Sequence, residues 1–246
     1  MASRVSEMAS RPMSLSVVVP CFDEELRIGT SLAHLYDTLT AMSLPEWEVL
    51  VVDDQSTDRT VAIVETWGKI HPQVRLASVQ GGKGKGAAVR TGVLLARYDA
   101  VLVVDADLAG DIGVVPQMCE RLASADAVIG SRLLPGAVVE PARSLARRVA
   151  ALAFRIAVRS MTTLRVSDPQ CGFKMFRRDV VQPHVAQMQT TGYAYEVELL
   201  LRLTKAGAVI EEIPVTWREG HDSKVRLLSD GCRMLRELWS ARTHAR

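Results

Sequence analysis

Two aspartates separated by one residue, Asp105 and Asp107, follow directly on the apolar run 101–104. Four consecutive β-formers are typical of a buried central strand in a parallel sheet, and open α/β sheets bind ligands at the carboxyl ends of such strands. Neighbouring carboxylates repel each other unless a cation bridges them, and hard oxygen ligands suit Mg²⁺ or Mn²⁺ carrying a phosphate. The pair indicates a metal-phosphate site, with two solvated carboxylates in a strand-ending turn as the simpler alternative.

Acidic side chains also follow the first apolar run, 15–20, which ends at Pro20. Because proline has no backbone N–H group, we expect it to stop the strand and to place Phe22, Asp23 and Glu24 in a loop. This loop lies at the same sheet edge as the first aspartate pair if the strands are parallel. Capping of the helix that follows is the alternative role for Asp23 and Glu24.

The second apolar run, 47–52, ends in a further acidic pair, Asp53 and Asp54. A carboxylate at this edge can accept hydrogen bonds from a ribose or from the N3–H group of a pyrimidine. These two aspartates are therefore candidates for nucleotide binding beside the first loop.

The third run, 74–79, leads into a glycine-rich loop that carries Lys83 and Lys85 and opens a helix containing Arg90. Backbone N–H groups, the helix dipole and two lysines all favour an anion at such a helix N-terminus. We therefore predict a phosphate next to this loop. A Walker A loop is excluded because Gly86 stands where Ser or Thr is required.

The same loop also satisfies the pattern G-x-G-x-x-A at Gly82, Gly84 and Ala87, with an aspartate about 20 residues further on. This spacing keeps a dinucleotide-binding (NAD-type) oxidoreductase open as an alternative. The position of the motif argues against it, since the glycines follow the third strand-like run instead of the first.

A further strand-like run, 126–131, delivers Arg132 to the same edge. The planar guanidinium of arginine can clamp a diphosphate through two parallel hydrogen bonds. Acids, lysines and an arginine at one rim suit a metal-bound nucleotide better than a hydride carrier.

The elements that must position these residues are apolar strand-like runs alternating with amphipathic stretches, which is the pattern of a parallel sheet covered by helices. The 246 residues, 48% hydrophobic and 24% charged, fit one α/β domain with extensions or two small domains. A net charge of +2 without a basic tail gives no indication of nucleic-acid binding.

The four cysteines lack CxxC spacing, which favours reduced thiols in a cytosolic setting. The N-terminal stretch 1–12 has no apolar core of a signal peptide, and no window approaches about 18 uncharged apolar residues. We expect a protein that is soluble or lies on a membrane surface without crossing it.

Eight segments in register resemble the family 2 glycosyltransferases, most closely the branch that loads sugars onto dolichyl or polyprenyl phosphate. They extend over nearly the whole chain, from residue 15 to about residue 224. The segments are 19–25, 51–58, 84–92, 105–107, 130–132, 168–174, 195–198 and 214–217.

The resemblance implies a GT-A nucleotide-diphosphosugar transferase fold, with a mainly parallel sheet and helices on both faces, and inverting hexose transfer. In such enzymes the first loop and the aspartate at position 53 hold the base and ribose, while the D-x-D pair holds Mg²⁺ or Mn²⁺ on the diphosphate. The residues thereby assigned to the nucleotide sugar are Pro20, Phe22, Asp23, Glu24, Asp53, Asp54, Lys83, Lys85, Arg90, Asp105 and Ala106, with Asp105 and Asp107 on the metal.

The segment 170–174 and the Lys85 loop look especially like the dolichyl-phosphate glucosyltransferases, which implies UDP-glucose as donor. GDP-mannose as donor and a soluble acceptor stay open as alternatives. Two departures are evident: the family usually has Asp where Glu196 stands, and its C-terminal Gly-Ser-Lys appears here as Asp222-Ser223-Lys224. The first leaves a role for Glu196 as catalytic base open, and the second leaves open the loop geometry around Lys224.

A phosphate acceptor has a second pKa near 6, so at pH 7 it is mostly a dianion and needs cations more than a general base. The candidates for binding it are Arg132, Lys174, Arg218 and Lys224. We expect Glu198 to orient these cations. The residues expected to take part in catalysis are Asp107, Arg132, Glu196, Glu198, Arg218 and Lys224.

Two basic amphipathic stretches complete the chain. At about 100° per residue, the arginines of 142–161 cover one side of a helix and its large apolar residues gather on the other. Residues 225–239 repeat this pattern. We expect a catalytic domain over 13–224 and an amphipathic helix within 225–246, both held on the anionic cytoplasmic face of a membrane. A helix packed on the sheet with a solvated arginine face is the alternative for 142–161.

Overall fold

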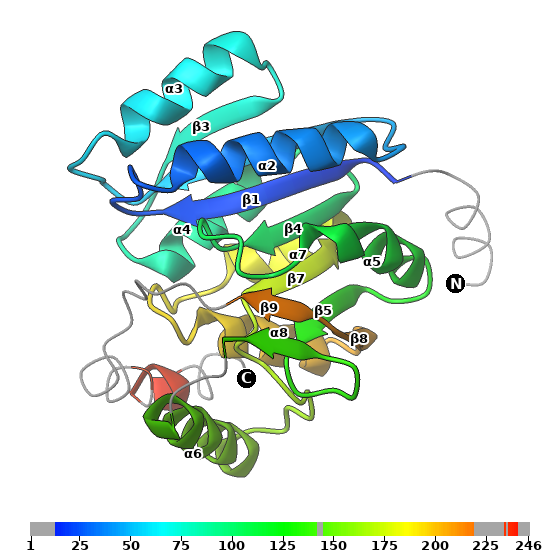
Figure 1. Ribbon diagram of the computed structural model, residues 1–246. Coiled ribbons are helices and arrows are strands. Elements are labelled where there is room, and N and C mark those ends of the chain that lie inside the picture. Colours follow the sequence, from blue (N-terminus) through cyan, green and yellow to red (C-terminus); the bar gives the residue numbers. More distant parts are fainter. Residues whose placement is uncertain (1–12, 142–144, 219–233, 235, 241–246) are drawn as a thin grey trace.

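The computed structural model describes residues 13–141, 145–218, 234 and 236–240 (Figure 1). Within these residues, the main sheet has seven strands in the order β3-β2-β1-β4-β7-β5-β8. β7 runs antiparallel to both of its neighbours, and the other pairs are parallel. The predicted α/β class is confirmed. The strands are β1 (Leu15–Cys21), β2 (Trp47–Asp53), β3 (Val74–Ser78), β4 (Ala100–Val104), β5 (Ala127–Ser131), β7 (Phe173–Arg177) and β8 (Ile210–Pro214).

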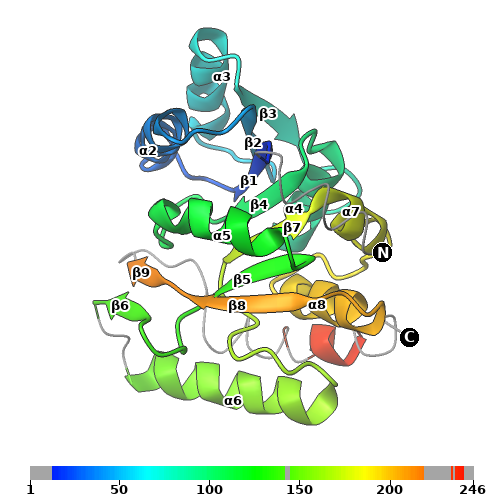
Figure 2. The same ribbon diagram turned by 90° about the vertical axis from the view of Figure 1, so that its right-hand side faces the viewer.

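Helices cover both faces of this sheet, as Figures 1 and 2 show. Along β1, Val17 and Val19 face one layer and Val18 faces the other, because successive strand side chains point to opposite faces. The first core includes side chains of α2, α3, η1 and α5, and the second includes side chains of α4, α6, α7 and α8. The helices are α2 (Ile28–Ala41), α3 (Thr60–Ile70), α4 (Lys85–Leu95), the 3₁₀ turn η1 (Ile112–Val114), α5 (Val115–Leu122), α6 (Leu145–Met161), α7 (Arg178–Ala186) and α8 (Tyr195–Lys205).

Pro20 does not stop the first strand, contrary to the expectation. It pairs in register with Val52, and β1 continues to Cys21. The carbonyl of Cys21 accepts a hydrogen bond from Asp54 on the β2 side, so Pro20 turns its nitrogen to the opposite side. There β4 pairs with β1 only as far as Val18, so proline interrupts no hydrogen bond of the ladder.

A second, two-stranded sheet joins β6 (Val138–Glu140) and β9 (Thr216–Arg218) in parallel. β9 follows β8 in the chain and returns beside the loop after β4, where Arg218 N donates to the carbonyl of Ala109 at 2.7 Å. Trp217 forms an isolated bridge with Gly110. The end of β9 is thereby placed close to the aspartate pair.

α6 lies at the outer edge of the molecule, beside the short helical segment near residues 236–240 (Figure 2). Phe154 and Val158 bury one side of α6 in the second core. The apolar stripe that the sequence placed opposite the arginines is exposed: Leu145 is 74%, Val149 58%, Leu152 49% and Ile156 58% accessible.

The expected helix 142–161 is therefore present from Leu145, with 142–144 outside the described residues. The alternative, in which the apolar stripe packs on the sheet and the arginines face solvent, is not what the structure shows. Both the stripe and the arginines lie on the outer half of the helix, since Arg148 and Arg159 are exposed as well. In the parts of the chain that the structure describes, no helix has the length and apolar composition needed to cross a bilayer.

Candidate active site

Asp105 and Asp107 lie just beyond β4, at the edge where β1, β2 and β3 also end. The turn between them is held by Ser31 of α2, whose hydroxyl donates to the carbonyl of Ala106 at 2.6 Å. Asp107 Oδ1 accepts a hydrogen bond from Ala109 N at 3.2 Å. The pKa of Asp107 is raised, because protein atoms displace water from its carboxyl group and because Asp105 carries a like charge.

Lys85 reaches this pair from the first turn of α4, with its Nζ 2.6 Å from Asp105 Oδ1. Burial disfavours the charged ammonium, but the attraction of Asp105 outweighs it, and the pKa of Lys85 is raised. The ammonium lies 5.9 Å from the ring centre of Tyr195 in the first turn of α8. Lys85 thus connects the aspartate pair with the N-terminus of α8.

The start of α4 offers fewer backbone N–H groups to a phosphate than the sequence indicated. Gly86 N and Ala87 N both donate to the carbonyl of Thr191, at 2.7 and 3.3 Å, and Gly84 N donates to Asp54 Oδ2 at 2.8 Å. The glycines allow this close approach, since a Cβ atom at Gly84 would lie 2.6 Å from the Thr191 carbonyl oxygen. These three amides are therefore already bonded and Lys85 is paired with Asp105, and a phosphate next to this loop remains a prediction.

Arg90 was expected to contact the nucleotide sugar, but the structure gives its guanidinium another use. It donates to the carbonyls of Gly81 at 2.6 Å, Gln80 at 3.3 Å and Met188 at 3.2 Å. A direct contact is therefore not what the geometry favours. Arg90 holds the glycine-rich loop against the turn that precedes α8.

The first two loops are joined through Asp23, which adopts a positive φ of 50°. Its Oδ1 accepts from Thr57 N at 2.7 Å, and its own N–H donates to Ser56 Oγ at 2.9 Å. Asp53 also turns to its own loop, accepting from Ser56 N at 3.2 Å. These contacts tie the first loop to the second and fix the shape of both.

Asp54 differs from Asp53. It is buried, its Oδ1 has no hydrogen-bond partner among the described residues, and burial raises its pKa. Nearby, Lys83 Nζ lies 5.4 Å from the ring centre of the half-exposed Phe22. Residues from the first, second and third loops therefore lie at one edge, as the sequence predicted, and their contact with a nucleotide remains a prediction.

Glu24 completes the first loop. Its backbone N–H donates to Thr60 Oγ1 at 2.7 Å, its carbonyl receives the N–H groups of Arg27 and Ile28, and its carboxylate lies 2.8 Å from Arg27 Nε. The Glu24 carboxylate does not cap α2, whose N-cap position is Arg27 and has no side-chain capping hydrogen bond, so the capping alternative is not supported.

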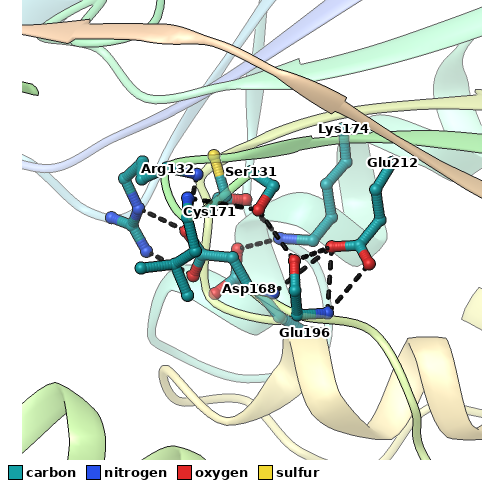
Figure 3. Close-up of polar contacts among 9 residues, drawn as sticks. Ser131, Arg132, Asp168, Cys171, Lys174, Glu196 and Glu212 are labelled. Atoms are coloured by element: carbon teal, nitrogen blue, oxygen red, sulfur yellow. Dashed lines mark hydrogen bonds and ion pairs between the residues drawn. The ribbon is translucent and has the colours of Figure 1, made fainter. Parts of the chain in front are cut away.

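Arg132 follows β5 and lies in a buried polar cluster (Figure 3). Its Nε and Nη2 donate to the two oxygens of Asp168 at 2.6 and 2.8 Å, and its guanidinium lies 4.9 Å from the ring centre of Trp217. Burial raises the pKa of Asp168, but the hydrogen bonds and charge of Arg132 outweigh it, and the pKa is lowered. This bidentate pair fixes the guanidinium plane.

Lys174 and Glu196 form a second buried pair in the same cluster (Figure 3). Lys174 Nζ donates to Glu196 Oε1 at 2.7 Å and also to the carbonyl of Cys171. Only 3% of Lys174 and 5% of Glu196 is accessible. The carboxylate that a general-base mechanism would use is therefore neutralised by a lysine, and Lys174 is already paired.

Glu198 does not orient the predicted cations in the described structure. Both its oxygens accept from the backbone N–H of Gln189, Oε2 accepts from Thr190 N at 2.7 Å, and Arg202 donates to Oε1 at 2.9 Å. Burial raises its pKa, but the hydrogen bonds from these partners prevail and lower it. Glu198 instead fixes the turn that leads into α8.

Of the remaining predicted cations, Arg218 is exposed at the end of β9, and Lys224 lies outside the described residues, as does most of 225–246. Three residues that sequence reasoning missed, Ser131, Ser167 and Glu212, complete the polar cluster. The one visible signal is a glutamate inside the strand-like run 210–214, which would otherwise pass for a solvated strand face.

The donor set of the aspartate pair fits a hard divalent cation. No cluster of three or more acidic, histidine or cysteine side chains with metal-site geometry occurs among the described residues. Two carboxylates at a sheet edge are nonetheless what Mg²⁺ requires when a diphosphate and water supply its other ligands. Burial and the like charge of Asp105 raise the pKa of Asp107, and a bound cation would relieve the second of these effects.

Comparison with known proteins identifies the family. The model of glycosyl transferase family 2 matches residues 16–184, more than half of the chain. The chain belongs to glycosyl transferase family 2. This membership removes support from the oxidoreductase alternative. The matched part contains the aspartate pair, the Lys85 loop, Arg132 and Lys174, so the predicted resemblance to this family is confirmed.

Curated relatives of this family 2 chain include a dolichyl-phosphate beta-glucosyltransferase of Trichomonas vaginalis, 32% identical over 85% of the chain and 65% of the relative. The corresponding protein of Dictyostelium discoideum is 30% identical over 91% of the chain and 72% of the relative. An undecaprenyl-phosphate mannosyltransferase of Micrococcus luteus is 29% identical over 87% of the chain and 88% of its own length. The chain thus spans about two thirds or more of these proteins.

Solved structures show the fold. Glucosyl-3-phosphoglycerate synthase from Mycobacterium tuberculosis in complex with UDP superposes with a TM-score of 0.69 at 20% identity, covering 98% of this chain and 84% of that one. The same protein with Mn²⁺, UDP-glucose and glycerol 3-phosphate gives a TM-score of 0.67. The predicted GT-A fold is confirmed.

Proposed function

We propose that this family 2 enzyme transfers glucose from UDP-glucose to a dolichyl or polyprenyl phosphate with inversion. The observation that carries the proposal is the pairing of Glu196 with Lys174 beside the Arg132–Asp168 pair, at the same rim as Asp105 and Asp107. One side of this rim carries carboxylates suited to a metal ion, and on the other side the glutamate is neutralised by a lysine. Such a rim suits a negatively charged acceptor that needs no general base. The dolichyl-phosphate glucosyltransferases among the curated relatives support this donor and acceptor.

On the donor side, we assign Asp105 and Asp107 to a bound Mg²⁺ or Mn²⁺, which when present supplies Lewis-acid stabilisation of the leaving diphosphate. The Mn²⁺ in the complex of a structural neighbour supports this choice of ion. Lys85, 2.6 Å from Asp105, would place a second positive charge at the diphosphate. Phe22, Asp53 and Asp54 would hold the nucleoside in the first two loops.

On the acceptor side, a phosphate oxygen forms the new bond to the anomeric carbon from the face opposite the diphosphate. The bond from that carbon to the diphosphate oxygen breaks, and the nucleoside diphosphate leaves with the electron pair. A phosphate dianion has no proton to lose, so no general base is required. Cations must instead place it, and we assign this to Arg132, Arg218 and Lys224, with Lys174 holding Glu196 in place.

A mannosyl transfer from GDP-mannose is the second candidate. It is favoured by one relative, the undecaprenyl-phosphate mannosyltransferase of Micrococcus luteus, which this chain covers over 88% of its length. Both candidate reactions would use the same rim. Their donors differ in the nucleotide base and in the orientation of one sugar hydroxyl.

Calorimetric titration of UDP and GDP, each with and without Mn²⁺, distinguishes these donors. We expect UDP to bind at least about tenfold more tightly with Mn²⁺ than without it, because the cation bridges the diphosphate and the aspartate pair. GDP should bind more weakly than UDP under both conditions. A preference for GDP would support mannosyl transfer, and tight NAD binding without metal would contradict the transferase assignment.

We also propose that α6 lies on the anionic cytoplasmic face of a membrane, where the lipid acceptor presents its phosphate. Its exposed stripe, Leu145, Val149, Leu152 and Ile156, is bordered by arginines on the same outer half of the helix. An exposed apolar stripe with adjacent cationic side chains is the composition of an interfacial helix. Trp239, 62% exposed on the neighbouring C-terminal segment, suits the same interface.

Vesicle sedimentation tests this placement. Binding to anionic vesicles should weaken with salt, because the Debye length falls from about 10 Å at 0.1 M to about 3 Å at 1 M. The triple change Arg148, Arg155 and Arg159→Glu should release the protein. The matched control, Lys69, Arg97 and Arg121→Glu, changes charge equally at sites away from α6 and should still sediment. Equal binding to neutral and anionic vesicles at all salt concentrations would contradict the proposal.

A further inference from the structure

Glu212 of β8 accepts hydrogen bonds from Asp168, the first residue of the segment 168–174, and from Ser167, which precedes it. Its two oxygens accept from Ser167 N, both at 2.9 Å, and Oε1 also accepts from Ser167 Oγ at 2.5 Å and from Asp168 N at 3.3 Å. Figure 3 shows Glu212 within the polar cluster. Charge-assisted hydrogen bonds of this kind are the strong ones, so the carboxylate anchors this end of the segment.

The anchored segment contacts the assigned residues on both sides of the rim. Asp168 holds Arg132 through a bidentate pair. Gly172 lies so close to the Asp105 carboxylate that a larger side chain has no room there. The carbonyl of Cys171 accepts a hydrogen bond from Lys174 Nζ, which also donates to Glu196. A displacement of the Ser167 backbone would therefore first displace Asp168 and, through it, the Arg132 guanidinium.

A second path leads from Glu212 to Arg132. Ser131 Oγ and Ser167 Oγ lie 2.8 Å apart, and Leu133 N donates to Ser131 Oγ at 3.3 Å. An ionised carboxylate only accepts, so Ser167 donates to Glu212, Ser131 donates to Ser167, and the direction of the chain is determined. Arg132 is thus held through its side chain by Asp168 and through its chain neighbours by the serines.

We propose that Glu212 is a positioning residue, which fixes the plane of the Arg132 guanidinium and thereby the place of the acceptor phosphate. The role of the acceptor phosphate rests on the function proposed above, whereas the effect on Arg132 does not. Its four hydrogen bonds come from three donors, Ser167 N, Ser167 Oγ and Asp168 N, so this place favours a charged acceptor. Glutamine would lose the negative charge that strengthens these bonds and would turn an NH₂ group toward Ser167 N, which also donates to Oε2.

The first test reads the position of Arg132 without any substrate. The guanidinium lies 4.9 Å from the Trp217 ring, so a shift of the charge should move the indole N–H resonance of Trp217. This resonance is assigned by its loss in Trp217→Phe. We expect Glu212→Gln and the milder Ser167→Ala to move it, and Glu211→Gln to leave it in place. Glu211 is the matched control, since it is the neighbouring glutamate and contacts Arg121 and Ser124 instead.

The second test is a double-mutant cycle with Arg132→Lys in the transfer assay. Misplacement of a substrate by about 1 Å costs up to about 10²-fold in rate, so Glu212→Gln should lower kcat/KM for the lipid phosphate about 10- to 100-fold. It should leave the affinity for UDP unchanged. In the Arg132→Lys background the same change should cost less than about threefold, because the group it positions is already lost.

Three outcomes would overturn the proposal: an unmoved Trp217 resonance in both variants, additive effects in the cycle, or an equal loss of UDP affinity and acceptor kinetics. The last two would show that Glu212 supports the fold in general. If Glu212→Gln does not fold, Ser167→Ala carries both tests, since it removes one link and leaves the carboxylate. Failure of the wild-type protein to use any lipid phosphate would contradict the proposed function and leave the resonance test intact.

Discussion

Asp107→Ala is expected to abolish sugar transfer while the fold is retained. The substitution removes one of the two carboxylates assigned to the cation, and loss of Lewis-acid stabilisation should lower kcat by at least about 10³-fold. The fold should survive because the one described side-chain hydrogen bond of Asp107 is the one it accepts from Ala109 N. Turnover of UDP-glucose with Mg²⁺ measures the effect, and circular dichroism with a thermal melt checks the fold.

Asp99→Ala is the matched control for this variant. Asp99 precedes β4, at the opposite end of the strand that delivers Asp107, and its side chain is exposed. The control should keep its activity and its affinity for Mn²⁺ with UDP. Unchanged turnover of Asp107→Ala in the presence of Mg²⁺ would remove the metal assignment from this pair.

Glu196→Gln should keep its chemical step within about tenfold of the wild type, whereas loss of a true general base costs roughly 10² to 10⁴. The reason is the ion pair with Lys174, which neutralises the carboxylate, together with an acceptor that needs no deprotonation. The protein should be less stable, since removing one partner of a buried ion pair leaves the other charge uncompensated. Single-turnover kinetics measure the chemical step, and a thermal melt measures the stability.

Arg218→Ala provides the contrast. Arg218 is exposed at the end of β9, close to Ala109, and is assigned to the acceptor phosphate. Its loss should lower kcat/KM for the lipid phosphate by about 10²-fold through poor placement. Lys224→Ala is expected to act in the same way. A fall of about 10³-fold in the chemical step of Glu196→Gln, with acceptor affinity unchanged, would instead indicate an alcohol acceptor with Glu196 as base.

The strands, and the edge at which the acids gather, could be predicted from the sequence. Apolar runs such as 101–104 bury both faces of a strand, and the polar residues that follow them can lie only at the strand ends. The order of the eight resemblance segments likewise indicated the family, which residues 16–184 confirm. Local pattern was sufficient here, because a strand followed by a ligand loop is encoded within about ten residues.

The hydrogen-bond partner of each polar group was decided by the tertiary structure. Gly86 N donates to Thr191, Arg90 to Met188 and Ser167 to Glu212, and in each pair the two residues are far apart in the sequence. For that reason the sequence did not indicate the protein partners of the amides at the start of α4 or of the Arg90 guanidinium, and Glu212 went unnoticed. The outward stripe of α6 has the same origin. Periodicity shows that a helix has an apolar side, but only the packing of Phe154 and Val158 determines which side is buried, because burial depends on surfaces brought together from distant parts of the chain.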